Sequence, residues 1–362
     1  MKYSVSHWYL SFVFLFLLTA GGFVRAEEQD PYQRAMLILE AAEESDDESL
    51  QNKQVGEAIE LLKSAVQLGN ADAMVQLAFL YANGIGCSKN ENAAYDLLKQ
   101  AAAKKNGIAS LNLGHLALKK KDFKSACEHY LNAMLADVPE AGYYFGQLCL
   151  SGLGTERDPV RAAKAFRTDA LRGLAKAQNM LGVLYFKGMG VELNYKEAER
   201  LFNLAAEQND SAAINNLGVI ARLQNSKEGY ELAFRRFQIS AGLGFPAAFR
   251  NLSQAYLTGT GTAVDYQKAC QFAEQGAEKG DSACLHLLGC IHLYGFGVEK
   301  NPEKAFPFYL RAAEKGYNLA MIQVAKMYRE GSGVKADDAQ AEIWQKKSEQ
   351  TQIVSAGLSV PE

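Results

Sequence analysis

The sequence predicts an all-α protein built as a superhelical α/α solenoid of about eight repeats. Three observations predict this fold: a recurring Gly-x-Gly motif, a recurring bulky–small residue pair, and amphipathic helical patterns on both sides of each motif. The chain has 362 residues, of which 48% are hydrophobic and 22% charged, so it has enough apolar side chains for a large core.

The two markers define the period of the repeat. The Gly-x-Gly motif occurs at residues 84–86, 152–154, 188–190, 259–261, 295–297 and 331–333. The bulky–small pair begins at Leu77, Leu113, Phe145, Leu181, Leu217, Leu252, Leu288 and Val324, mostly 36 residues apart. The pair therefore counts eight repeats, and we predict that the second and fifth are complete units with altered turns.

Each repeat reads as two helices joined by the glycine turn. In the fourth repeat, residues 176–187 and 195–209 both carry apolar residues at helical spacing, and Gly188-Met189-Gly190 lies between them. The second helix has an alanine eight residues after the second glycine, at Ala94, Ala162, Ala198, Ala269, Ala305 and Ala341. Because a two-helix unit cannot bury its apolar stripe alone, successive units are expected to stack into a superhelix.

A Gly-x-Gly motif after an apolar run also occurs in nucleotide-binding loops. Here the third glycine of a dinucleotide fingerprint is replaced by Leu193, no strand precedes the motif, and no Gly-Lys-Ser/Thr follows it. A turn that is needed once per repeat explains six copies of the motif. The sequence therefore predicts a turn and no cofactor.

The pattern A-x-x-x-LG-x-LY-x-x-G-x-GV-x-x-x-x-x-KA…AAEKG resembles the Sel-1-like repeat family, relatives of tetratricopeptide repeats. Residues 280–315 and 316–350 carry this pattern well, and the resemblance covers residues 71–350. It implies a right-handed α/α superhelix that acts as an adaptor or scaffold. Exported bacterial members of the family are implicated in regulation of envelope signalling or in host-cell contact, and lumenal eukaryotic relatives serve in protein quality control.

The ends of the chain differ from the repeats. Residues 1–26 are predicted to be a signal peptide, because an apolar run at 8–20 precedes Val24-Arg25-Ala26, which fits a cleavage site; an uncleaved anchor is the alternative. Residues 27–70 are predicted to be a degenerate N-terminal helical cap, with helices at 32–44 and 53–69 separated by the acidic loop EESDDES. Residues 351–362 are expected to form a flexible tail.

In the architecture of this family, the first helix of each repeat lines the concave side. Some positions on that helix change chemistry from repeat to repeat, and exposed aromatic, amide and arginine side chains suit peptide or protein capture. The alternative is that these positions merely tolerate variation. The predicted partner-binding residues are Tyr143, Gln147, Asn179, Phe186, Asn215, Arg222, Arg250, Gln254 and His286.

Four residues, Cys284, His286, Cys290 and His292, have the residue types of a metal site. Only His286 and Cys290 share a helical face, so packing is expected there and no metal. Disulfides among Cys127, Cys149, Cys270, Cys284 and Cys290 stay open, because sequence cannot choose a pairing. No catalytic set stands out.

These observations predict an exported, non-enzymatic adaptor that is monomeric and binds a protein or peptide on its concave face. The formal net charge of −3 argues against nucleic acid as the main partner. The compartment would be the periplasm or the secreted space, with a eukaryotic ER lumen as the alternative. Competing functions are a structural scaffold for cell-envelope assembly, lumenal protein quality control and, as a further alternative, a hydrolase.

Overall fold

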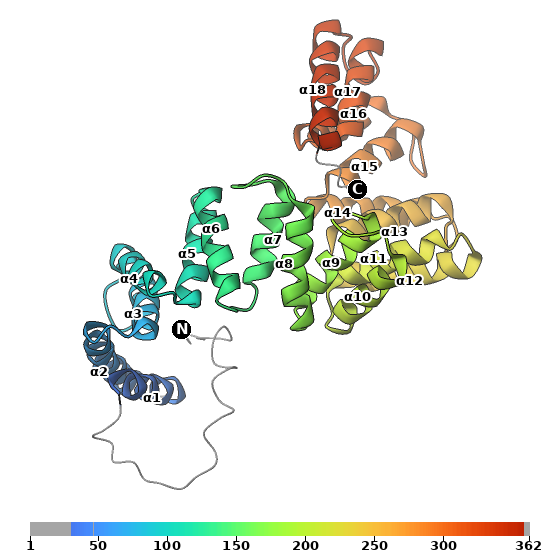
Figure 1. Ribbon diagram of the computed structural model, residues 1–362. Coiled ribbons are helices and arrows are strands. Elements are labelled where there is room, and N and C mark those ends of the chain that lie inside the picture. Colours follow the sequence, from blue (N-terminus) through green and yellow to red (C-terminus); the bar gives the residue numbers. More distant parts are fainter. Residues whose placement is uncertain (1–29, 46, 358–362) are drawn as a thin grey trace. The chain divides into compact units, whose positions relative to one another are not determined.

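The computed structural model describes residues 30–45 and 47–357, and this part of the chain contains eighteen α-helices and no strand (Figure 1). The predicted signal peptide, residues 1–26, lies outside the described residues. The chain divides into two compact units at Arg157. Among residues 30–45 and 47–357, no helix combines the length and the apolarity that a bilayer span requires.

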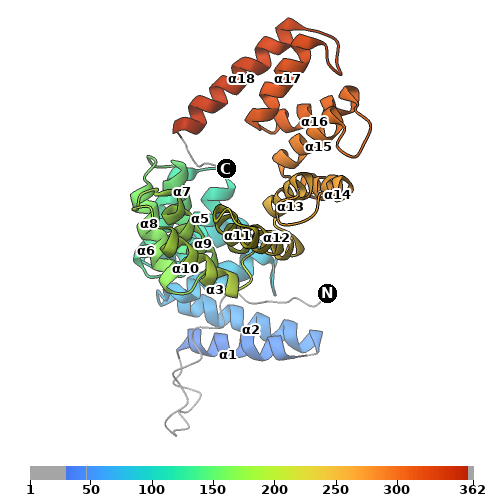
Figure 2. The same ribbon diagram turned by 90° about the vertical axis from the view of Figure 1, so that its right-hand side faces the viewer.

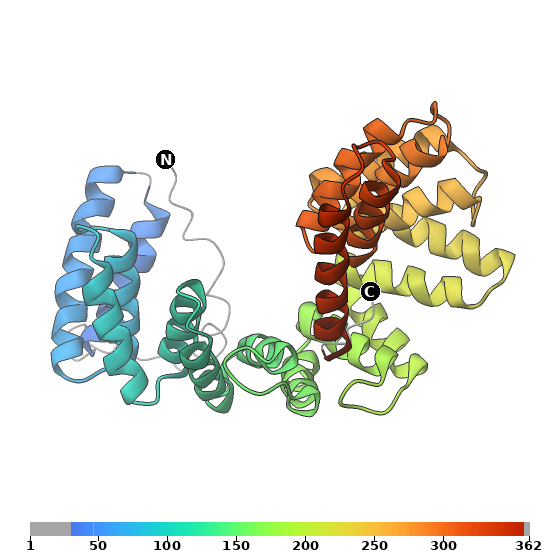
Figure 3. The same cartoon turned by 90° about the horizontal axis from the view of Figure 1, so that it is seen from above.

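Within each unit, consecutive helices pack side by side, as Figure 3 shows for the first unit and Figure 2 for α17 and α18 of the second. The first unit holds α1 (Pro31–Glu44), α2 (Glu48–Gln67), α3 (Ala71–Asn83), α4 (Glu91–Ala103), α5 (Gly107–Lys119), α6 (Phe123–Leu135) and α7 (Ala141–Ser151). The second holds α8 (Pro159–Leu171), α9 (Ala175–Lys187), α10 (Tyr195–Glu207), α11 (Ser211–Leu223), α12 (Lys227–Gly242), α13 (Pro246–Thr258), α14 (Tyr266–Glu278), α15 (Ser282–Tyr294), α16 (Pro302–Glu314), α17 (Asn318–Glu330) and α18 (Asp338–Gly357). From α3 onward, we call the odd-numbered helix of each repeat helix A and the even-numbered one helix B.

The Gly-x-Gly motif is a turn between helix A and helix B, as predicted. Gly188 ends α9 in the left-handed conformation, with φ of 64°, and its N–H donates to the carbonyl of Leu184. Asn194 then caps α10: its side-chain oxygen accepts from the N–H of Glu197 at 3.0 Å, and its own N–H donates to Tyr185 at 2.9 Å. The turn is therefore closed by bonds at both of its ends.

The second glycine of the motif lets each turn rest on the preceding repeat. A Cβ atom on Gly190 would lie 2.3 Å from the carbonyl carbon and oxygen of Pro159, the first residue of α8. Only glycine permits this approach, because backbone atoms cannot move aside. The motif thus serves contact between repeats as well as chain reversal.

The second and fifth repeats form complete helix pairs, as predicted from the bulky–small marker. Their turns, residues 120–122 and 224–226, are short and contain no glycine; Lys121 and Asn225 supply the left-handed conformation instead, with φ of 59° and 51°. Asp122 and Ser226 cap the following helices by accepting backbone N–H groups.

The core of a repeat is closed by a ring of helix B that packs on a glycine of helix A. A Cβ on Gly182 would lie 2.7 Å from the Cε1 atom of Phe202, which is 1% exposed. The same geometry recurs in other repeats, at Gly114 with Tyr130, Gly218 with Phe237 and Gly289 with Tyr309. The small half of the bulky–small marker is therefore small because a ring occupies the space of its side chain.

The ends of the described chain differ from expectation in two details. Helix α2 begins at Glu48, five residues earlier than predicted, because the acidic Asp47 acts as its N-cap and accepts from the N–H groups of Ser49 and Leu50. Most of the predicted acidic loop is therefore helical. The predicted tail also starts inside a helix, since α18 continues to Gly357.

The ring-on-glycine contact predicts a specific sensitivity. Gly182→Ala should lower the free energy of unfolding by about 1–3 kcal/mol, because the added methyl group overlaps Phe202. Gly56→Ala, in an open position on α2, should instead raise it by about 0.5–1 kcal/mol through helix propensity. Urea denaturation followed by circular dichroism measures both changes. Adding Phe202→Leu to Gly182→Ala should restore part of the loss, and equal effects of the two glycine substitutions would refute the contact.

Candidate partner-binding site

The nine predicted residues lie on helices A, but the structure places them in different surroundings. Tyr143 and Gln147 on α7 lie next to each other and are half-buried, and the amide of Gln147 donates to the hydroxyl of Tyr143 at 2.9 Å. Phe186 on α9 packs its ring edge-on against Tyr195, with ring centroids 5.4 Å apart. These three side chains are partly open to solvent.

Asn179 and Asn215 are buried rather than exposed, with 8% and 5% of their surfaces accessible. Asn216 donates to the side-chain oxygen of Asn179 at 2.9 Å, and Asn251 donates to that of Asn215 at 2.8 Å. Each bond joins helix A of one repeat to helix A of the next. We call these four residues the asparagine ladder. The expectation of amides presented to a partner was therefore wrong for Asn179 and Asn215, because the neighbouring repeat already uses their oxygens.

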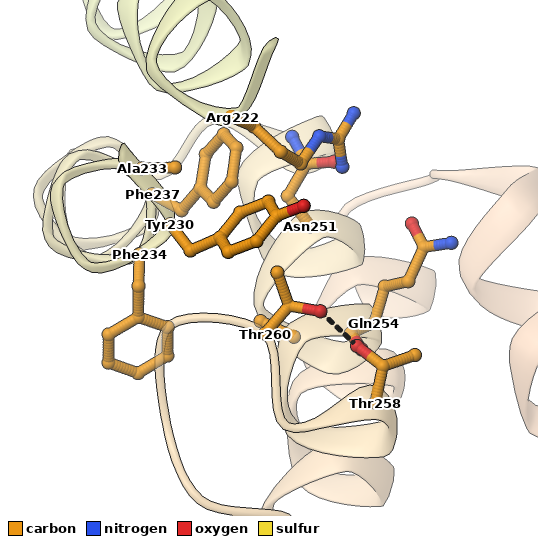
Figure 4. A pocket seen from close by; sticks show the side chains of 10 residues that line it. Arg222, Tyr230, Ala233, Phe234, Phe237, Asn251, Gln254, Thr258 and Thr260 are labelled. Atoms are coloured by element: carbon orange, nitrogen blue, oxygen red, sulfur yellow. Dashed lines mark hydrogen bonds between the residues drawn. The ribbon is translucent and has the colours of Figure 1, made fainter. Parts of the chain in front are cut away.

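Arg222 and Gln254 meet at a pocket of about 280 Å³ in the second unit (Figure 4). Arg222 comes from the last turn of α11, and Gln254 from α13. The other lining residues are Tyr230, Ala233, Phe234, Phe237, Asn251, Ala255, Thr258 and Thr260. In Figure 4 the rings of α12 form one wall, while the polar side chains of α13 and its turn face them.

The pocket lies where the fifth repeat departs from the common pattern. Helix α12 has 16 residues, three more than α10 or α14, because the shortened turn lets it begin earlier. Gly261 of the next turn packs on the backbone of Tyr230, which is not the first residue of its helix, whereas Gly190 packs on Pro159, the first residue of α8. The extra turn of helix, residues 227–229, thus lies before this contact, and Tyr230 has the place in its repeat that Tyr195 has in the fourth repeat.

Arg222 is the one charged side chain among the ten that line the pocket. Its guanidinium carbon lies 6.0 Å from the ring centroid of Phe237, which is compatible with a cation–π contact. The hydroxyl of Tyr230 donates to the side-chain oxygen of Asn225, in the shortened turn. The pocket therefore combines a cation, aromatic rings and uncharged polar groups.

His286 and Cys290 come together on α15, as their spacing predicted. The Nδ1 atom of His286 lies 3.8 Å from Sγ of Cys290, and the Tyr309 hydroxyl donates to the same sulfur at 3.2 Å. Burial lowers the pKa of His286 and raises that of Cys290, so both groups favour their neutral forms. The cluster is a packed polar contact.

Cys284 and His292 lie apart from that cluster. Cys284 is fully buried, and burial with Asp281 nearby raises the pKa of its thiol to about 12, although Arg250 acts in the opposite direction. His292 stacks on Phe308 with ring centroids 5.5 Å apart. Among the described residues, no group of three or more His, Cys, Asp or Glu side chains is arranged to hold a metal ion.

The structure shows the surroundings of the cysteines whose disulfide pairing the sequence left undecided. Cys270, Cys284 and Cys290 are free thiols, so no disulfide joins these three. Cys127 and Cys149 are buried in α6 and α7. Burial raises the pKa of Cys270 to about 11, helped by Glu274, so this thiol is a weak nucleophile near neutral pH.

Sequence comparison missed most of the pocket. Tyr230, Phe234 and Thr260 were not singled out, since they belong to helix B or to a turn. The signal that could have pointed to the two rings is their helical spacing with Phe237, since residues 230, 234 and 237 lie on one face of helix B. For the asparagine ladder, the signal was the recurrence of asparagine one or two residues before the bulky marker, at Asn179, Asn215, Asn216 and Asn251.

A model of the Sel1 repeat matches residues 71–106, 139–164, 175–210, 246–281, 282–317 and 318–348, which is more than half of the chain. The chain belongs to the Sel1 repeat family. Sel1 repeat proteins are generally scaffolds for protein interaction. The matched segments leave out most of the second and fifth repeats, the two that have short turns without glycine.

Known relatives agree with this assignment. The chain is 28% identical to c5321, described as a protective antigen present in uropathogenic Escherichia coli strains and displaying an SLR fold, with a TM-score of 0.58 over 81% of this chain and 64% of that one. It is 29% identical to a Sel1 repeat protein from Oxalobacter formigenes, with a TM-score of 0.58 over 66% and 99%. It is also 29% identical over 261 residues to the uncharacterized protein NMB1327 of Neisseria meningitidis serogroup B. The alignment covers 71% of this chain but only 52% of that protein, so the chain spans about half the length of this curated relative.

The asparagine ladder predicts a cost that an exposed contact residue would not show. Asn215→Ala should lower the free energy of unfolding by about 1–3 kcal/mol, because the buried amide of Asn251 loses its acceptor. Asn203→Ala, on the exposed face of α10, should change it by less than about 0.5 kcal/mol. Chemical denaturation compares the two. The double variant Asn215→Leu/Asn251→Leu should recover much of the lost stability. An Asn215→Ala variant as stable as Asn203→Ala would show that the hydrogen bond between Asn215 and Asn251 does not stabilise the fold.

Proposed function

We propose that this protein is an exported, non-enzymatic adaptor that binds a protein or peptide partner through helices A. The observation that supports the proposal is that different residues of a repeat serve packing and face solvent. Some features recur between repeats: the glycines of the turns, the glycines against which aromatic rings pack, and the helix caps. These features serve packing and chain reversal. The residues that differ between repeats, such as Phe186, Arg250 and Gln254, reach solvent.

The chemistry of these variable residues supports protein recognition. Tyrosine and arginine carry much of the binding energy in protein interfaces because they combine a large apolar area with directed hydrogen bonds. Tyr143 in the first unit and Arg250 in the second are half-buried, so part of each side chain is already fixed while the rest stays accessible. Binding therefore costs less side-chain entropy at Tyr143 and Arg250 than it would at fully exposed side chains.

Two observations support export. The N-terminal residues 1–26 read as a signal peptide, and the likeness to an Escherichia coli protein described as a protective antigen is consistent with a place outside the cytoplasm. We place this protein in the periplasm or the secreted space. There it would hold a partner, as Sel1 repeat proteins generally do.

A capture experiment tests the binding surface. The protein is immobilised and exposed to extracts of its source organism, beside a variant with Tyr143→Ala, Phe186→Ala and Arg250→Ala. We expect the variant to retain a partner about tenfold less well or worse, because aromatic and arginine anchors are removed. Quantitative mass spectrometry of the retained proteins measures the difference.

A matched control changes helix B instead. Lys164→Ala, Glu199→Ala and Gln271→Ala alter three exposed residues of α8, α10 and α14 and should leave capture unchanged. Circular dichroism verifies that both variants keep their helices. Equal capture by the wild type and the helix-A variant would reject helices A as the binding surface.

Export has a direct chemical readout. If the signal peptide is cleaved after Ala26, the mature protein should begin at Glu27. Mass spectrometry of the protein recovered from the periplasm or the medium reads its N-terminus, and Ala26→Leu should block processing. A protein that keeps its first residues and stays in the cytoplasm would contradict the proposal.

A further inference from the structure

We propose that the pocket between α11, α12 and α13 binds a peptide carboxylate together with the apolar side chain next to it. This inference deepens the proposed function and rests on it, because it names the ligand class of one subsite on the helix-A surface. The carboxylate would come from the C-terminus of the partner or from an Asp or Glu side chain. The two sources share the same chemistry and are separated by the experiment below.

Charge is the first argument. Arg222 lines the pocket, and none of the other nine lining residues is acidic. Within the part of the chain that the structure describes, Arg222 has no ion-pair partner. Arginine can bind a carboxylate with two parallel hydrogen bonds, which are stronger and more directional than those to neutral groups. An unneutralised guanidinium beside a pocket therefore favours an anionic ligand.

Hydrogen-bond accounting gives the second argument. The Tyr230 hydroxyl donates to Asn225 and the Thr258 hydroxyl donates to the carbonyl of Gln254, so neither proton is available to a ligand. The side-chain amide of Gln254 and the guanidinium of Arg222 have no hydrogen-bond partner among the described residues. Both groups present N–H donors, and a carboxylate accepts from several donors at once.

The aromatic wall gives the third argument. Tyr230, Phe234 and Phe237 come from successive turns of α12 and face the pocket (Figure 4). Rings of this kind bind aliphatic or aromatic side chains by burying apolar area. A volume of about 280 Å³ is near the lower end for small-ligand sites, which start at about 300 Å³. It suits the last one or two residues of a peptide.

Among the eight repeats, an arginine stands five residues after the bulky marker in the fifth and the eighth. Arg329 occupies the position of Arg222 in the eighth repeat, five residues after the bulky marker, but it is exposed and followed by a regular Gly-x-Gly turn. In the fifth repeat, Tyr230, Phe234 and Phe237 of α12 line the pocket together with Arg222. Arg329 is thus a matched control: it has the same charge and the same place in the repeat, without the aromatic wall.

The test uses three short synthetic peptides ending in Val-Leu: one with a free C-terminal carboxylate, one with a C-terminal amide, and one amidated but with a glutamate before Val-Leu. Each is titrated into the purified protein by isothermal titration calorimetry, up to millimolar concentration. We expect binding by at least one of the two carboxylate peptides, about tenfold tighter than by the neutral amide. The peptide that binds identifies the source of the carboxylate.

Variants assign the binding to the pocket. Arg222→Gln should weaken binding about tenfold or more, Arg222→Lys should weaken it less, and Arg329→Gln should leave it unchanged. Thr258→Glu, at the exposed rim, should also weaken binding by placing a carboxylate near Arg222. Circular dichroism verifies the fold of each variant.

Three results would overturn the proposal: no binding by any peptide, equal binding by the neutral amide, or binding that survives both Arg222→Gln and Thr258→Glu. The capture experiment on Tyr143, Phe186 and Arg250 uses residues outside the pocket, so its outcome is separate. Partner capture through those residues without peptide binding would leave the adaptor function standing and reject the pocket. Failure of both would reject the adaptor surface itself.

Discussion

Close packing between the marker residue of helix A and one side chain of helix B, in several repeats a ring on a glycine, is the constraint on which the helix pairs depend. In four repeats the glycine of the bulky–small marker packs against an aromatic residue of helix B: Tyr130, Phe202, Phe237 or Tyr309. Three other repeats have Ala78, Ser253 or Ala325 in the marker and Leu98, Ala273 or Gln345 at the same place of helix B. The two positions change together because they share one volume, and close packing leaves no room for both a side chain and a ring.

This constraint separates the residues that a repeat needs from those it can vary. The glycines, the buried alanines and the capping residues hold the two helices and the turn in place, whatever the repeat binds. Variation is left to helix-A side chains outside that framework and to turns that tolerate a different length. Both kinds of variation occur in the fifth repeat, which has a short turn, a longer helix B and Arg222 on helix A.

The fold could be predicted from the sequence because the same marker occurs in every repeat. Eight copies of one marker exposed the helix pairs even where the glycine turn was absent, as at Lys121 and Asn225. The candidate site was harder, because periodicity does not tell which neighbour a side chain faces. Asn179 varies between repeats as a surface residue would, yet it is buried against the next helix A. The pocket brings helix A of two repeats together with a helix B, and spacing within one repeat does not show which side chains meet there.

The asparagine ladder has a consequence for cooperativity. In a solenoid each repeat contacts only its neighbours, so the interfaces between neighbouring repeats set how far unfolding is shared along the array. Here directional bonds tie α9 to α11 and α11 to α13, and each is lost entirely once its two helices part. The fourth, fifth and sixth repeats are thereby coupled more strongly than apolar stacking alone would achieve. They would open as one block, and the pocket-bearing repeat lies at the centre of that block.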